Sequence, residues 1–117
     1  MPRIADAHGV EVSIEYLEEC PVTMNDVSAT DFAFQTASEL FGEQRTFALP
    51  RPLTGTEDFS RVLERVPGAM VLIGACPEGR DPEMAPSNHS PHAAFDDAVL
   101  PDGAALYAEL ALRQLNR

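Results

Sequence analysis

Tryptophan and lysine are absent from this 117-residue sequence, and cysteine occurs only twice. The positive charge comes from eight arginines, which are scattered along the chain and form no basic patch. Nineteen acidic residues bring the formal net charge to −11. Nucleic acid and anionic membrane are therefore excluded as expected partners, because both require a basic surface.

Long apolar runs are also absent. The longest, residues 69–73, is far shorter than the roughly 20 residues that cross a membrane. The first four residues lack the apolar stretch of a secretory signal. Cys20 and Cys76 form no C-x-x-C pair, and such cysteines beside apolar residues are more often small buried side chains than metal ligands or a disulfide. We therefore expect a cytoplasmic location.

Three segments predict β-strands. Residues 10–17 alternate apolar and polar side chains, a period of two that predicts a strand with one face in water. Residues 69–73 are five apolar residues in a row, which predicts a strand buried on both faces beneath helices. Residues 45–49 are a third, shorter candidate.

Three helices are expected between and after these strands. The first starts at Asn25 or Asp26, either of which can cap it, and stops at Gly42. The second covers residues 54–66, with apolar side chains at helical spacing, and the third covers residues 101–114. Helices that alternate with buried strands predict an α/β fold.

A long, proline-rich loop is expected over residues 74–100, and it carries the sequence Asn88-His89-Ser90-Pro91-His92. Loops of this length in compact domains are usually functional or disordered. Imidazole is the commonest side-chain metal ligand, and His89 lies between polar residues rather than on an apolar stripe. On the residues alone, His89 and His92 are also consistent with ordinary solvated histidines.

The start of the second expected helix is another candidate site. Thr54 and Glu57 have the spacing of a capping box, and Gly55 and Thr56 lie between them. Exposed amides at a helix start can bind an anion, such as a substrate carboxylate. A plain capping box without a ligand explains the same pattern.

In order along the chain, these segments resemble the aminoacylase-like two-metal amidohydrolases, in particular the branch with hippurate hydrolases and indole-acetyl-amino-acid amidohydrolases. The resemblance rests on residues 8–12 with 21–26, on Leu53-Thr54-Gly55-Thr56-Glu57-Asp58-Phe59-Ser60 with residues 66–74, and on Asn88-His89-Ser90-Pro91 with residues 95–97. It covers nearly the whole chain, with the three motifs in the family's order.

The resemblance implies a fold and a domain division. Residues 1–22 would be the end of an inserted lid that often dimerises, contributing its last strand. Residues 23–117 would be the C-terminal part of an α/β catalytic domain. A homo-oligomer, or association with another chain, is therefore an expected partner state.

The resemblance also implies an activity and site residues. The family binds two divalent metal ions, often zinc, manganese or cobalt, and a metal-bound water cleaves the amide of an N-acyl amino acid or a similar small amide. His89 matches the last metal ligand of the family, and Asn88 and Ser90 would orient its ring. Gly55, Thr56 and Glu57 match a segment that lines the substrate cleft.

The sequence departs from the family in one large respect. The other metal ligands and the glutamate general base belong to an N-terminal half that has no counterpart here, so no catalytic residue is assigned in this chain. Because a catalytic metal takes about three protein ligands, we expect the metals not to be held by this chain alone. A catalytically inactive remnant and a small α/β binding or association module are the alternative interpretations.

Overall fold

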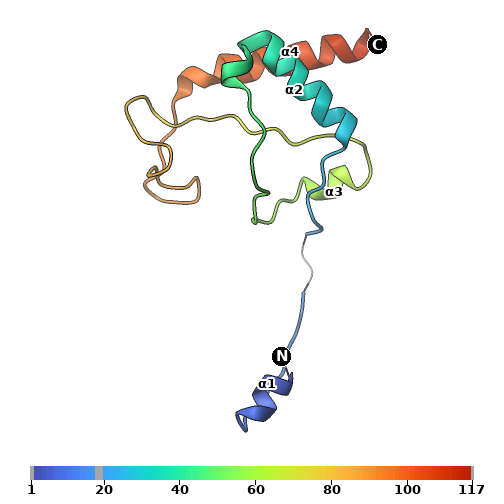
Figure 1. The fold of residues 1–117 in the computed structure, drawn as a ribbon, viewed down its shortest axis with the longest axis vertical. Coiled ribbons are helices and arrows are strands. Elements are labelled where there is room, and N and C mark those ends of the chain that lie inside the picture. The colour runs from blue at the N-terminus through green and yellow to red at the C-terminus, as the bar shows by residue number, and fades with distance from the viewer. Residues whose placement is uncertain (1, 18–19, 117) are drawn as a thin grey trace.

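The computed structural model describes residues 2–17 and 20–116, and in these residues it contains helices and no strand. The elements are α1 (Pro2–Ala7), α2 (Val27–Phe41), the 3-10 helix η1 (Glu43–Arg45), α3 (Ser60–Leu63), the 3-10 helix η2 (Asp97–Val99) and α4 (Leu100–Leu115). Figure 1 shows α2 and α4 together at one end of the molecule and α1 at the other. No described helix has the length and apolar character of a membrane span.

The first predicted helix is confirmed as α2, and Asp26 and Gly42, which the sequence predicts at its two ends, are the residues that cap it. The Asp26 carboxylate accepts hydrogen bonds from the Ala29 amide at 2.9 Å and from the Ser28 hydroxyl at 2.6 Å. The bond from the Ala29 amide satisfies one of the backbone donors that the first helical turn leaves unpaired. The helix ends at Gly42, whose φ of 91° lies in the region that favours glycine.

The third predicted helix is confirmed as α4, which packs on α2. The buried residues of these two helices are small on α2 and larger on α4: Ala33, Thr36 and Ala37 on α2, and Leu106 on α4. Ion pairs connect the same elements, from Arg113 of α4 to Glu39 of α2 and from Asp102 of α4 to Arg45 of η1. This helix pair contains all of the buried apolar residues in the described chain.

The second predicted helix is largely wrong. Only Ser60–Leu63 is helical, with isolated turns before and after it. Phe59, Val62 and Val66, which form the expected apolar face, remain exposed. A short isolated helix is marginal in water, so this segment lacks the packing that would extend it.

The predicted strands are not observed in the described residues. Residues 10–17 run without regular structure, and their apolar face is exposed, up to 85% at Tyr16. The expected lid strand is therefore not seen, and η1 takes the start of segment 45–49. The prediction that residues 69–73 are buried on both faces is wrong, since Leu72 is 53% exposed. A strand exists only with a hydrogen-bonded neighbour, and residues 2–17 and 20–116 supply none.

Residues 68–75 are nevertheless held in place at both ends. The Asn25 amide group donates to the Met70 carbonyl at 3.2 Å and accepts from the Met70 amide at 2.9 Å. The Asp26 amide donates to the Gly68 carbonyl at 2.9 Å, and the Asp96 amide donates to the Ala75 carbonyl at 3.0 Å. The segment is thus fixed beside the start of α2 and the approach to α4.

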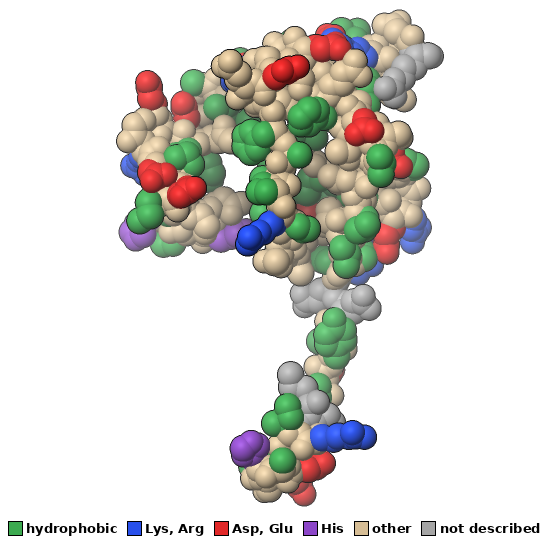
Figure 2. All heavy atoms as spheres, in the orientation of Figure 1, with side chains coloured by type: hydrophobic (Ala, Val, Ile, Leu, Met, Phe, Trp, Pro, Cys, Tyr) green, Lys and Arg blue, Asp and Glu red, His purple; other side chains and the backbone are tan. Residues whose placement is uncertain are grey.

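The molecule leaves much more surface in water than a closed domain does. Its accessible area is 10218 Å², whereas a folded monomer of 12.7 kDa exposes about 6,200 Å². Its radius of gyration is 19.6 Å, against about 13 Å for a compact domain of this length. Apolar side chains are spread over the visible surface in Figure 2. The described chain therefore does not enclose a core of its own beyond the helix pair.

Candidate functional site

The predicted loop over residues 74–100 is confirmed as irregular up to residue 96, with His89 in a turn, whereas η2 and the first residue of α4 occupy its end. The Ser90 amide donates to the Ser87 carbonyl at 2.9 Å, and the Ala93 amide donates to the Ser90 carbonyl at 3.0 Å. The Ser90 hydroxyl accepts from the His92 amide at 3.1 Å. These bonds define the backbone around His89 and leave its side chain exposed.

The base of this loop is closed by Asp96. Its amide bonds the Ala75 carbonyl, and its carboxylate caps η2 by accepting from the Ala98 amide at 2.9 Å. Residues 76–95 therefore leave and return at nearly the same place, between the end of segment 69–75 and the start of α4. The fold thus fixes both ends of the loop that carries His89.

Asn88 and Ser90 are predicted to orient the His89 ring. In the described chain, no hydrogen bond joins either side chain to the imidazole, and the Ser90 hydroxyl is bound to the backbone of His92 instead. Asn88 is exposed and Ser90 is half-buried. The orienting role of these two residues stays a prediction, as does the role of His89 as a metal ligand.

Gly55, Thr56 and Glu57 do not lie at a helix start, which corrects the predicted capping box. The helix begins at Ser60, and Thr54 caps nothing there. The Glu57 carboxylate accepts from the Phe59 amide at 3.1 Å, and its carbonyl accepts from the buried Ser60 hydroxyl at 2.5 Å. The expected anion site at a helix N-terminus therefore has no structural basis. The lining of a substrate cleft by this segment stays a prediction.

The structure does not bring the two predicted site segments together. Residues 55–57 and the loop around His89 occupy separate places in Figure 1, and no described hydrogen bond or ion pair joins them. Over residues 2–17 and 20–116, no cluster of three or more His, Cys, Asp or Glu side chains can hold a metal ion. The residues present thus do not form a metal centre by themselves.

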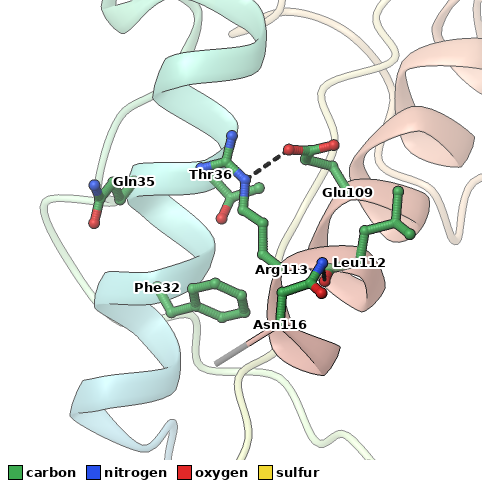
Figure 3. A pocket seen from close by; sticks show the side chains of 7 residues that line it. All are labelled: Phe32, Gln35, Thr36, Glu109, Leu112, Arg113 and Asn116. Atoms are coloured by element: carbon green, nitrogen blue, oxygen red, sulfur yellow. Dashed lines mark hydrogen bonds and ion pairs between the residues drawn. The ribbon is translucent and has the colours of Figure 1, made fainter.

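A shallow groove of about 530 Å³ lies between α2 and α4, at a place that the sequence does not predict. Its lining consists of Phe32, Gln35, Thr36, Glu109, Leu112, Arg113 and Asn116. Figure 3 shows Arg113 reaching from α4 toward Thr36 of α2, with a bond to Glu109. The Thr36 hydroxyl is buried and has no hydrogen-bond partner in the described chain.

The charges at this groove are already paired. The guanidinium of Arg113 binds Glu39 and, at 2.7 Å, Glu109. Hydrogen bonds donated by Arg113 and then by Gln35 lower the pKa of Glu39, and the hydrogen bonds that the guanidinium donates to Glu109 and then to Glu39 raise the pKa of Arg113. Both groups are thus held in their charged forms at neutral pH. The arrangement joins two helices and offers no free acid or base for catalysis.

Comparison with known proteins places the chain among metallohydrolase relatives. It is 36% identical over 112 residues to a hippurate hydrolase of Campylobacter jejuni, which covers 96% of this chain and 27% of the relative. It is 30% identical over 117 residues to an IAA-amino acid hydrolase of Arabidopsis thaliana, covering 97% of this chain and 26% of the relative. A thermostable carboxypeptidase of Saccharolobus solfataricus is 30% identical over 115 residues, covering 97% of this chain and 28% of the relative.

The chain spans about a quarter of the length of these curated relatives. No solved structure matches it significantly. The family model described as "Peptidase family M20/M25/M40" matches residues 2–113, which is almost the whole chain. This protein chain belongs to that peptidase family.

Proposed function

We propose that this chain is part of a metal-dependent amidohydrolase that cleaves the amide bond of N-acyl amino acids or related small amides. The observation that carries the proposal is the family match over residues 2–113. The names of two relatives, a hippurate hydrolase and an IAA-amino acid hydrolase, support this substrate class. Because the chain spans a quarter of their length, the activity requires residues beyond those described here.

Enzymes of this family use divalent metal ions, but the described residues do not fit a complete metal site. One histidine cannot replace the roughly three protein ligands of a catalytic metal. We assign His89 as a single ligand of a site whose other ligands and general base lie elsewhere in the family domain. Its exposed imidazole, on a turn between Pro86 and Pro91, supports this assignment.

The domain division accompanies this proposal. Residues 1–22 belong to a lid domain, and residues 23–117 belong to the C-terminal part of a catalytic domain. The position of α1 far from the helix pair in Figure 1 supports a division in this part of the chain. In the catalytic part, Gly55, Thr56 and Glu57 line the substrate cleft, and Asn88 and Ser90 orient the ring of His89.

The test uses a polypeptide that contains residues 2–113 and is as long as the relatives. In this polypeptide one histidine at a time is replaced. His89→Ala should lower hydrolysis of hippurate by roughly 100-fold or more and reduce the bound metal, because a lost ligand costs at least as much as a lost orienting partner. His92→Ala, on the same loop, is the matched control and should retain both. Full metal content and normal hydrolysis in His89→Ala would contradict the proposal.

A second candidate function is a catalytically inactive association module. The large exposed apolar surface favours it. In that case the polypeptide carrying residues 2–113 would bind a partner chain and show no hydrolysis of hippurate with zinc, manganese or cobalt present. An anion-binding module at Thr56 is not proposed, because no helix begins there.

A further inference from the structure

We propose that residues 69–75 form a docking strand for the remainder of a family domain, and that they accept this remainder even when it is supplied as a separate polypeptide. The segment runs from the start of α2 to the approach to α4, and it is the most apolar stretch of the sequence. The kind of partner is thus a polypeptide that contributes strands on both sides of this segment.

The backbone of the segment is prepared for such pairing. Hydrogen bonds hold Gly68 and Met70 against residues 25–26, and Ala75 against Asp96. Between these anchors, no hydrogen bond within the described chain uses the amides or carbonyls of residues 71–74. A row of unpaired backbone groups in a fixed position is a template for strand addition.

The side chains show that neither face of the segment is fully covered by the described chain. An added Cβ at Gly103 of α4 would lie 3.1 Å from Cδ1 of Ile73, so α4 touches one face closely. Even so, Val71, Leu72 and Ile73 are each about half exposed. Strands with apolar residues on both faces are typical of sheets covered on both sides, so the segment requires strands and helices that are not present in these residues.

The amount of exposed surface indicates an extensive partner. The accessible area of 10218 Å² exceeds that of a closed monomer of this mass by about 4,000 Å². Permanent interfaces bury roughly 2,000–5,000 Å², and they resemble a domain core cut in two. A short peptide would cover too little of this surface.

Two observations favour the remainder of the domain over a second copy of this chain. The relatives are nearly four times as long as the segment that they share with it, so the family domain contains the required additional elements. Each copy carries a formal charge of −11, and like charges oppose self-association. A second copy would also pair one edge of the segment and leave the other open.

The test mixes the full chain with truncated relatives from which the aligned residues have been deleted. The hippurate hydrolase of Campylobacter jejuni and the probable hydrolase of Synechocystis, which aligns over 101 residues, are both prepared in this way. Each truncated relative is first mixed with its own deleted residues, supplied as a separate polypeptide. A relative that binds them is then used as the probe. We expect a one-to-one complex with this chain, and at least roughly 100-fold slower hydrogen exchange at the amides of residues 71–74.

Matched variants locate the interface. Leu72→Lys should weaken the complex by about tenfold or more, because the ammonium would be buried beside apolar groups. Leu115→Lys, at a residue that is 82% exposed on α4, should bind like the unmodified chain. Helix content measured by circular dichroism should be the same in both variants as in the unmodified chain, as expected if α2 and α4 are kept.

Three results would overturn the inference. The probe could rebind its own residues and not this chain, the complex could form without protection of residues 71–74, or the chain alone could form an oligomer in which those amides are protected. Binding without hydrolysis would uphold the inference and count against the proposed enzymatic function. The two proposals therefore fail separately.

Discussion

The segment of residues 69–75 is more apolar than the helix pair, yet the buried apolar side chains of the described chain lie in the pair. In the pair, Ala33, Ala37 and Leu106 are buried, and ion pairs join α2 to α4. In the segment, hydrogen bonds fix the two ends while Leu72 between them faces water. The comparison shows that the chain builds one packed contact by itself and fixes the ends of a second apolar element without burying its side chains.

The largest expected effect is on the packed contact between α2 and α4. Leu106→Ala should destabilise the helix pair by about 2–3 kcal/mol, because it removes the largest buried apolar side chain at the contact. Thermal melting followed by circular dichroism at 222 nm measures the loss. Leu115→Ala, in the same helix and exposed, should change stability by less than about 0.5 kcal/mol. Equal effects would show that the contact is not a core.

A smaller effect is expected where the segment is anchored. Asn25→Ala removes both side-chain hydrogen bonds to Met70 and should cost about 1 kcal/mol locally. The Met70 amide should then exchange faster, while the amides of α2 keep their protection. Asn116→Ala, which removes a bond to the Leu112 carbonyl, is the control and should leave Met70 unchanged. Loss of protection throughout α2 would show that the anchor and the helix are one unit.

The cap of α2 should give a weaker, pH-dependent effect. Hydrogen bonds from the Ser28 hydroxyl and then the Ala29 amide lower the pKa of Asp26 below its ordinary value. A carboxylate with a depressed folded-state pKa stabilises the fold fully above its unfolded pKa, and this contribution is lost as the pH falls through the folded pKa.

Asp26→Asn tests this assignment, because asparagine also caps helices but does not titrate in this range. The variant should keep the α2 helix at neutral pH and lose less helicity than the unmodified chain between neutral pH and the acidic range below the ordinary aspartate pKa. Circular dichroism during an acid titration measures the difference. Identical acid profiles would contradict the role of Asp26.

The smallest effect is expected at the ion pairs of the groove. Arg113→Met should lower the melting temperature slightly in low salt and hardly at all at about 1 M salt, because exposed pairs contribute little and are screened. Arg80→Met, an exposed arginine in the long loop, is the control. A large loss that persists in high salt would show that Arg113 acts through packing of its stem instead.

The parts of the fold that the sequence predicts correctly are determined by residues close together in the sequence. Asp26 and Gly42 specify the ends of α2 by their own chemistry, and Pro101 with Asp102 favours the start of α4. The proline-rich loop with His89 was predicted for the same reason. The pattern does not predict α1, because six residues are too few to show helical spacing.

The parts that were not predicted depend on contacts between distant residues. Residues 10–17 and 69–73 have strand patterns, but a strand needs a neighbour and the described residues supply none. The groove between α2 and α4 lies where Arg113 pairs with Glu39, 74 residues away, and no local pattern connects these two residues. A complete metal site could not be predicted, because one histidine motif does not specify its other ligands.

The contact between α2 and α4 also has a consequence for biosynthesis. Ribosomes add about 5–20 residues per second, so Arg113 is made roughly 4–15 s after Glu39, its partner 74 residues earlier. Throughout that interval α2 has no companion helix, and residues 69–75 are made about midway through it. The residues of α2 that are buried in the folded chain, Ala33 and Ala37 among them, therefore stay uncovered by α4 until the end of this stretch has been made.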